Sequence, residues 1–211
     1  SPVPDKLKPR VSDTAKTLWK VYALISFLEL LLLLLGGMEF FDALCHTFTT
    51  MPSGGFSPWN SSIAHYDSVY FDLVIMVFML FAGINFALHY QMLKGKPLAF
   101  WRDSECRFYL ALTGILIFVV TLNLYGQVYA SIWNALRYGA FQVISILTTT
   151  GYVTADYNQW PAMSRLILLL CMFAGASAGS TAGGMKLMRI MCCCKYCYKE
   201  LFTLVHPRAV A

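Results

Sequence analysis

The sequence predicts an all-α polytopic membrane protein made of two span–pore-helix–span repeats, with an intramembrane loop that breaks the last span. Three observations support this fold class. Hydrophobic residues make up 58% and charged residues 13% of the chain, which is too apolar for a typical soluble domain. Four apolar segments are long enough to cross a bilayer, and the order of elements between them occurs twice.

The four apolar segments are the predicted spans. Each is long enough to provide the roughly 20 residues that a helix needs to cross about 30 Å of hydrocarbon. The first segment starts too late and is too long for a signal peptide, and no small-residue cleavage site follows it. The predicted spans are residues 18–38, 69–93, 108–126 and 163–189.

The net charge of +5 is distributed unevenly along the chain. Basic residues gather in three segments, whereas the regions between them hold only Arg137 and Arg165. Because positive residues favour the cytoplasmic side of a membrane, this pattern predicts an orientation and argues against a nucleic-acid partner. The cytoplasmic segments are then 1–17, 94–107 and 196–211, and the outward-facing loops are 39–68 and 127–162.

The first repeat comprises residues 18–93. Between its two spans, the segment Glu39–Thr50 is too short to cross a bilayer but has the right length for a re-entrant helix. A glycine-containing turn at residues 53–57 follows it. Pro52 directly before the turn has no N–H to donate, so we expect the end of this helix to differ from its counterpart.

The second repeat comprises residues 108–195 and has the same order of elements. The segment Trp133–Leu147 is its re-entrant helix, and the turn at 149–153 echoes the first turn at a shift of 96 positions. The sequence Cys-Met-Phe-Ala-Gly at 171–175 similarly echoes Met-Leu-Phe-Ala-Gly at 79–83. Internal repeats of this kind are a common way to build transport proteins.

The two turns are candidate parts of a cation selectivity filter. A re-entrant helix directs its partly negative C-terminal end into the membrane, and the turn beyond it can present carbonyl oxygens to an ion, as in potassium channels. Either turn alone is an ordinary loop, but their matching positions in two repeats favour a filter. The candidate ion-binding residues are Ser53, Gly54, Gly55, Phe56, Thr149, Thr150, Gly151 and Tyr152. We expect both aromatic residues to brace their turns from behind.

Several motifs resemble the Trk/Ktr potassium uptake family, and in particular its TrkH-type membrane subunits. They are Ser-Gly-Gly-Phe-Ser at 53–57, Phe-Trp-Arg-Asp at 100–103, Thr-Thr-Thr-Gly-Tyr at 148–152, Ala-Gly-Ser-Thr-Ala-Gly-Gly-Met-Lys at 178–186 and His-Pro-Arg-Ala-Val at 206–210. The resemblance covers essentially the whole chain and identifies it as the second and third of four pore repeats.

The resemblance carries several functional implications. K⁺ is the transported ion, with no organic cofactor, and a glycine at every filter position favours potassium over sodium. The protein resides in the bilayer of the bacterial inner membrane as a homodimer. It binds a cytoplasmic nucleotide-binding subunit of the TrkA type. The chain is then a fragment of a longer transporter.

A run of small residues interrupts the last span and resembles the intramembrane gating loop of this family. Its candidate residues are Gly175, Gly179, Ser180, Thr181, Gly183 and Gly184. Close helix packing through glycines at four-residue spacing is the alternative. The corresponding segment 83–87 of the first repeat keeps large apolar residues, so we expect it to stay helical and the break to be specific to one repeat.

Charged residues beside these elements have candidate roles. Lys186 and Arg189 follow the loop at the inner mouth, where they could contact the loop or simply anchor the cytoplasmic side. Asp67 and Asp156 follow the two turns and could concentrate cations at the outer mouth or be solvated loop charges. Glu29 lies inside the first span and needs a partner there.

Two other functions remain open. The first is a sodium-permeable or sodium-coupled transporter of the same superfamily, which filter turns beyond these two would identify. The second is a membrane-embedded enzyme that binds a metal through the cysteines Cys192, Cys193, Cys194 and Cys197. Three consecutive cysteines point around a helix and suit a tetrahedral site poorly. No nucleophile–base pair stands out, so we expect no enzymatic chemistry and no other metal site.

Overall fold

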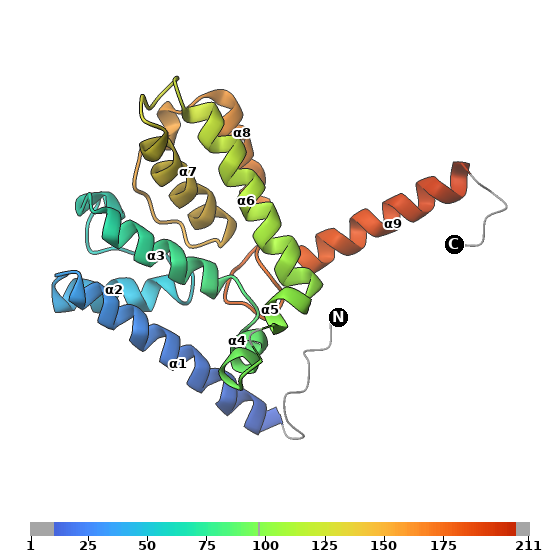
Figure 1. The fold of residues 1–211 in the computed structure, drawn as a ribbon, viewed down its shortest axis with the longest axis horizontal. Coiled ribbons are helices and arrows are strands. Elements are labelled where there is room, and N and C mark those ends of the chain that lie inside the picture. Colours follow the sequence, from blue (N-terminus) through green and yellow to red (C-terminus); the bar gives the residue numbers. More distant parts are fainter. Residues whose placement is uncertain (1–10, 97, 206–211) are drawn as a thin grey trace.

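The computed structural model describes residues 11–96 and 98–205, and every regular element in that part of the chain is a helix (Figure 1). The elements are α1 (Val11–Leu35), α2 (Phe40–Thr50), η1 (Ser62–His65), α3 (Val69–Ala82), α4 (Phe86–Leu93), α5 (Ala99–Arg102), α6 (Ser104–Leu124), α7 (Ile132–Leu147), η2 (Tyr157–Gln159), α8 (Ala162–Phe173) and α9 (Leu187–Val205).

The helices form two similar groups, which lie side by side in Figure 1. In the first group, α1 packs along the half-helix α2, and α3 returns beside it. In the second group, α6, α7 and α8 repeat this arrangement. Contacts between α3 and α7 join the two groups. Each group therefore consists of a long helix, a half-helix and a returning helix in contact with one another.

Two helices, α1 and α6, are long and apolar enough to cross a membrane, and α8 is a shorter apolar helix. Large apolar side chains on these helices are exposed, such as Phe27 of α1, Phe118 of α6 and Leu170 of α8. Such a surface suits lipid or protein neighbours and does not suit water. These features agree with the predicted polytopic membrane fold.

The prediction of a continuous helix in the second apolar segment is wrong. α3 ends at Ala82, α4 begins at Phe86, and the two helices are bent by 102°. Gly83 weakens the helix at this point. The Asn85 side chain then accepts a hydrogen bond of 2.9 Å from the Ala87 N–H and so caps a new helix in another direction. Both repeats therefore break their third helix.

The predicted break in the last span is confirmed. α8 ends at Phe173 and α9 begins at Leu187. The ends of the connecting segment are joined by hydrogen bonds from Gly175 N–H to Met185 O (2.8 Å) and from Met185 N–H to Phe173 O (3.2 Å). Residues 175–184, called the loop from here on, thus form a closed excursion with a narrow neck.

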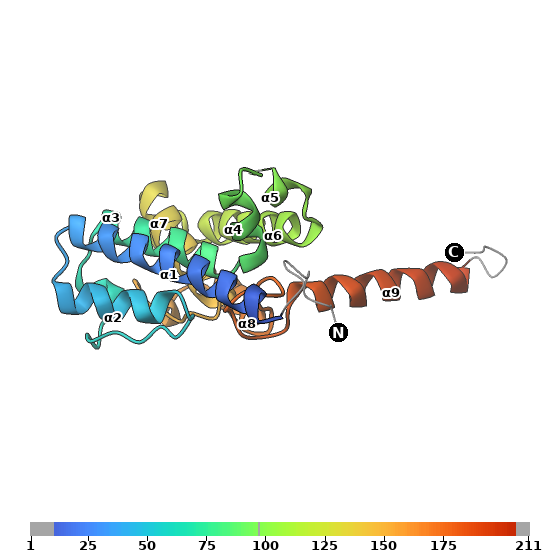
Figure 2. The ribbon, with the colours of Figure 1, turned by 90° about the horizontal axis from the view of Figure 1, so that it is seen from below.

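α9 projects away from the helices of both repeats in two perpendicular views (Figures 1 and 2). It continues to Val205, so the expected boundary at residue 196 falls inside a helix. The expected boundary at residue 18 similarly falls inside α1. The first ten residues and the family-like motif at 206–210 lie outside the described residues.

Candidate functional site

The first turn follows the C-terminal end of α2. The N–H groups of Gly54 and Gly55 both donate to the Thr49 carbonyl oxygen, at 2.8 and 3.0 Å. Ser53 and Gly55 adopt left-handed backbone conformations, with φ of 60° and 66°. The Thr49 hydroxyl also donates to the Phe56 carbonyl oxygen over 2.7 Å. One side chain therefore ties the far end of the turn to the helix.

The second turn has the same geometry 96 positions later. The N–H groups of Thr150 and Gly151 both donate to the Ser145 carbonyl oxygen, at 2.9 and 3.2 Å. Thr149 and Gly151 have φ of 60° and 88°. The Ser145 hydroxyl donates to the Tyr152 carbonyl oxygen over 2.7 Å. Each of the three bonds described for the first turn thus has a counterpart in the second.

Pro52 changes this geometry little. Its counterpart Thr148 donates its N–H to the Ile144 carbonyl oxygen over 2.9 Å, and Pro52 has no N–H with which to make that bond. The next bond is the same in both repeats, because Ser53 N–H and Thr149 N–H each donate over 3.0 Å to a carbonyl three residues back. The expected difference at the helix end is therefore limited to one bond.

The two turns lie against each other. A Cβ atom added to Gly55 would overlap the carbonyl oxygen of Thr150. Gly55 is therefore required both by its positive φ and by this close approach of backbone from the other repeat. Gly151 has a positive φ, but a Cβ there would meet no atom within 4 Å. The structure brings together the turn residues predicted from both repeats.

The aromatic residues of the turns differ in their surroundings. Tyr152 is fully buried between the repeats, and its hydroxyl donates to the His46 carbonyl oxygen over 3.1 Å. The same hydroxyl lies 2.6 Å from Thr49 Oγ1. Phe56 is 77% exposed. Tyr152 packs on a neighbouring repeat, whereas Phe56 has no such neighbour among the described residues, so its bracing role stays a prediction.

The loop contacts both turns. The Thr181 hydroxyl donates to the Met51 carbonyl oxygen over 2.7 Å and lies 3.3 Å from the Ser53 hydroxyl oxygen. On the other side, Gly183 N–H donates to Thr149 Oγ1 over 2.6 Å. The loop therefore bridges the two turns through side chains and backbone, which close helix packing between glycines does not explain.

The bend between α3 and α4 also holds the loop. The carbonyl oxygens of Ala82 and Gly83, which the helix break leaves free, accept hydrogen bonds from the N–H groups of Thr181 (3.3 Å) and Ser177 (3.0 Å). In return, Phe86 N–H donates to the Gly179 carbonyl oxygen over 3.2 Å. Polar backbone in a membrane must find such partners inside the protein.

Two charged side chains from outside the loop form hydrogen bonds with it. Lys186 donates to the Ala182 carbonyl oxygen and to Ser180 Oγ. The buried carboxylate of Glu105 accepts from Ala178 N–H at 2.7 Å and from Met188 N–H at 3.2 Å. Lys186 thus has the loop contact considered from the sequence, whereas Arg189 is exposed on α9.

The two outer-mouth candidates differ. Asp67 forms an ion pair of 3.2 Å with Arg137, whose guanidinium also bonds Asp72 at 2.6 Å, so its charge links the two repeats. Asp156 is exposed. Hydrogen bonds from the Asn158 N–H and then the Gln159 side chain hold its pKa below the usual range. Of this pair, only Asp156 forms no ion pair within the described part of the chain.

The remaining candidates are Glu29 of α1 and the four cysteines of α9. Glu29 is fully buried, and neither of its carboxylate oxygens has a hydrogen-bond partner in the described part of the chain. The four cysteines of α9 are exposed, and no group of three metal-ligating side chains occurs between residues 11 and 205, residue 97 aside. Nothing in this geometry supports the metal-binding alternative.

Comparison with known proteins supplies the family. The family model described as "TrkH: Cation transport protein" matches residues 3–211. The chain belongs to the TrkH family of cation transport proteins. This family is one of transporters and not of enzymes.

Curated TrkH relatives match almost the whole chain. The Trk system potassium uptake protein TrkH of Escherichia coli K12 is 40% identical over 98% of this chain and 43% of its own length. The TrkH protein of Vibrio parahaemolyticus is 38% identical over 99% of this chain and 44% of its own length. The chain therefore spans less than half the length of these relatives.

A solved structure agrees with the fold. The crystal structure of the potassium transporter TrkH from Vibrio parahaemolyticus matches with a TM-score of 0.92 and 36% identity. The match covers 98% of this chain and 45% of that one. The two chains therefore share the all-helical TrkH-type fold over this region.

Sequence reasoning does not identify several residues that hold the turns and the loop in place. Thr49 and Ser145 do so at matched positions, and the 96-residue shift is a signal that could pair them. Glu105 gives no such signal, because an acid in the first turn of a helix is an ordinary capping feature. Asn85 in an apolar segment suggests interhelical hydrogen bonding, whereas in the structure it begins a helix.

Proposed function

We propose that this chain supplies two of the four pore repeats of a potassium uptake transporter, with the turns 53–57 and 149–153 as filter turns. The observation that most supports this is their matched geometry, together with the direct approach of Gly55 to the Thr150 carbonyl. The names of the relatives, potassium uptake proteins, favour the same ion. Further repeats complete the ring in this proposal.

Ion passage follows from the chemistry of the turns. A potassium ion exchanges its water for carbonyl oxygens of Ser53, Gly54, Thr149 and Thr150 in this proposal. α2 and α7 end directly before these residues, so their partly negative C-terminal ends favour a cation there. No covalent step is needed, because the ion moves down its electrochemical gradient.

The loop is the gate in this proposal. It bonds to both turns and to the bend between α3 and α4, so it occupies the space beneath the filter. Lys186 and Glu105 bond to it at Ala182 and Ala178 and lie where the cytoplasmic mouth would be. Movement of either group would release the loop from the turns, which gives a regulatory subunit a route to the pore.

The remaining proposals concern placement and partners. Both termini face the cytoplasm of a bacterial inner membrane, and the transporter works as a homodimer with a TrkA-type nucleotide-binding subunit. The 94–107 segment is a candidate contact for that subunit, because a surface cavity of about 600 Å³ is lined there by Lys96 and Arg102. The projecting helix α9 is a second candidate (Figure 2).

Exchange of the filter glycines tests the proposal. Gly55→Ser and Gly151→Ser, each made in the complete transporter, are expected to lower the permeability ratio of potassium to sodium. Permeability ratios from reversal potentials or competing-ion uptake measure this. Control variants carry Gly37→Ser, because Gly37 has a positive φ but lies outside both turns. Unchanged ratios in both filter variants would remove the filter assignment, and a sodium preference in the unmodified transporter would support the sodium alternative.

A further inference from the structure

We propose that every repeat inserts the aromatic residue of its filter turn into the pore helix of the preceding repeat, and that Phe56 and a cavity beside Gln142 are two unfilled halves of such contacts. This inference rests on the proposed four-repeat pore. It assigns both an interaction surface and the chemical group that fills it: an aromatic side chain directly after a filter glycine.

The contact between the two repeats provides the pattern. Tyr152 of the second turn is buried against the first repeat, where its hydroxyl donates to His46 O and accepts from Thr50 Oγ1 over 3.3 Å. Its ring centroid lies 5.8 Å from that of His46. The ring also belongs to the core cluster that joins α3 to α7. A turn of one repeat is thus anchored on the half-helix of its predecessor.

The receiving half of this contact is open on the second repeat. A shift of 96 positions converts His46 into Gln142 and Thr50 into Ile146, and both of these residues line a cavity of about 210 Å³. About 150 Å³ is enough to hold a benzene ring. The cavity therefore has room for an aromatic side chain at the position that Tyr152 occupies on the first repeat.

The side-chain amide of Gln142 indicates that a polar group from outside these two repeats enters the cavity. This side chain is fully buried, yet neither its amide nitrogen nor its amide oxygen has a hydrogen-bond partner among the described residues. In the first repeat, the counterpart His46 contacts the Ser57 hydroxyl at 3.1 Å. The counterpart of Ser57 is Val153, which cannot make that bond. A polar atom of an incoming turn would satisfy the buried amide.

Met172 is a second cavity residue that lacks the cover its counterpart has in the first repeat. Met172 lines the cavity and is 48% exposed. Its counterpart at the 92-residue shift is Leu80, which packs against the cluster that contains Tyr152. The face that is covered in the first repeat is therefore uncovered in the second.

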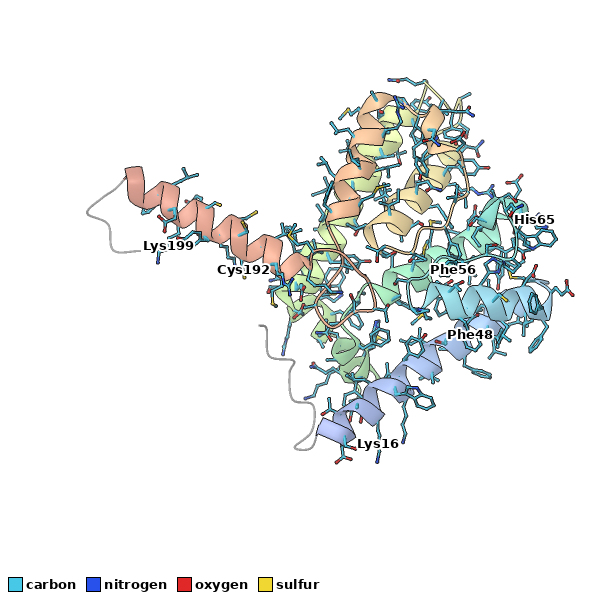
Figure 3. The ribbon with its side chains drawn as sticks, turned by 180° about the vertical axis from the view of Figure 1, so that it is seen from behind. Lys16, Phe48, Phe56, His65, Cys192 and Lys199 are labelled. Carbon is cyan, nitrogen blue, oxygen red and sulfur yellow. The ribbon has the colours of Figure 1, made fainter. Side chains whose placement is uncertain are left out.

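The inserting half of the contact is open on the first repeat. Phe56 is 77% exposed, whereas its counterpart Tyr152 is buried. Phe48 of α2 is 60% exposed, whereas its counterpart Ile144 is 3% exposed and packs beside Tyr152. Figure 3 shows both phenylalanines on the first repeat, one on α2 and one in the segment after it. These two exposed phenylalanines stand at the positions of two side chains that are covered in the second repeat.

The occupant of these faces is another span–pore-helix–span repeat of the same transporter. The curated relatives are more than twice as long as the matched region, so they contain enough chain for further repeats. A second copy of these two repeats is the competing occupant, and it would pair Phe56 of one copy with the cavity of the other.

Cysteine accessibility in the complete transporter tests this inference. The seven native cysteines are first replaced, and Phe56→Cys, Tyr152→Cys or Asn60→Cys is then introduced. A membrane-impermeant methanethiosulfonate reagent is added from both sides in separate assays. We expect thiols at 56 and 152 to react at least about tenfold more slowly than the thiol at exposed Asn60, because a buried thiol reacts only when its contact opens.

Val153→Cys replaces a side chain on the cavity wall with one of nearly the same size. It therefore gives a second measurement that does not require removal of an aromatic ring. Reaction of the thiols at 56 and 153 as fast as that at 60 would overturn the inference. Retained potassium selectivity in the same variants would leave the proposed function intact. Oxidation of a Phe56→Cys/Val153→Cys double variant reveals the competitor: a disulfide between two copies would show that a second copy fills the cavity, which also overturns the inference.

Discussion

The third helix of each repeat ends at the same point of the repeat, but the chain continues differently afterwards. In the first repeat, only Gly83 to Asn85 separate α3 from α4, and the chain turns by 102°. In the second repeat, the chain makes the excursion 175–184 before α9 begins. The first break exposes backbone carbonyls, and the second supplies the N–H groups that bond to them.

The bend and the loop are held in place by different kinds of contact. The bend is fixed by a helix cap at Asn85 and by the packing of α4 on α1. The loop, by contrast, is held by hydrogen bonds to other segments, and few large apolar side chains lie within it. Segments with few apolar contacts open at lower free-energy cost than helices do. In the proposed gating mechanism, the loop is therefore the part of this pair that moves.

The largest expected effect is the difference in stability and uptake between the variants Gly55→Ala and Gly151→Ala. Gly55→Ala places a methyl group on the Thr150 carbonyl oxygen, whereas Gly151→Ala adds only the cost of a left-handed backbone, about 1–2 kcal/mol. Gly55→Ala should abolish uptake and lower the thermal midpoint more than Gly151→Ala. Thermal denaturation in detergent and uptake assays measure both. Equal loss of stability in the two variants would show that the turns do not touch as described.

The next largest effect is expected from loss of the contact between Lys186 and the loop. Lys186→Met removes the charged donor that bonds Ala182 O and Ser180 Oγ, an interaction worth about 1.5–3 kcal/mol. Basal potassium uptake without the regulatory subunit should rise about tenfold or more, since about 1.4 kcal/mol is a factor of ten. Lys195→Met removes the same charge from an exposed position on α9 and serves as the control. Equal uptake in both variants would contradict a role for Lys186 in closing the loop.

The smallest effect compares the two outer acids. Asp156→Asn should reduce uptake less than about twofold, and only at low salt, because exposed charges are screened. The pKa of Asp156 is held low, so its charge persists as the pH falls and the reduction should be the same at about pH 5.5 and 7.5. Asp67→Asn should instead weaken the ion pair with Arg137 between the repeats. An effect of Asp156→Asn seen only at the higher pH would contradict this assignment.

Local sequence patterns are sufficient to predict the turns and the loop. Small residues, half-helix lengths and the shift of 96 positions all depend on neighbours along the chain, so the sequence alone pairs Gly55 with Gly151. The register even extends to Thr49 and Ser145, whose hydroxyls bond equivalent carbonyls. The break at 175–184 is visible because ten small residues cannot form a stable apolar span.

Features that depend on distant partners could not be predicted. The bend at Gly83 lies in a strongly apolar segment, and its free carbonyls are satisfied by a loop of the other repeat. The different surroundings of Phe56 and Tyr152 similarly reflect which repeat lies beside each turn, which neither local sequence contains. Glu105 acquires its role only because the chain returns to it at Ala178 and Met188.

In the proposed mechanism, hydrogen bonds from the loop to the filter turns keep the pore closed. Thr181→Val tests it most directly, because it removes the hydroxyl that donates to Met51 O and can accept from the Ser53 hydroxyl of the first turn, while it keeps the shape of the side chain. Thr154→Val is the matched control, since the buried Thr154 hydroxyl has no partner among the described residues.

Basal potassium uptake without the regulatory subunit is the measurement. Loss of two hydrogen bonds of about 0.5–1.5 kcal/mol each should raise uptake by about five-fold or more in Thr181→Val, with no rise in Thr154→Val. Unchanged uptake in a folded Thr181→Val transporter, or an equal rise in both variants, would contradict the account.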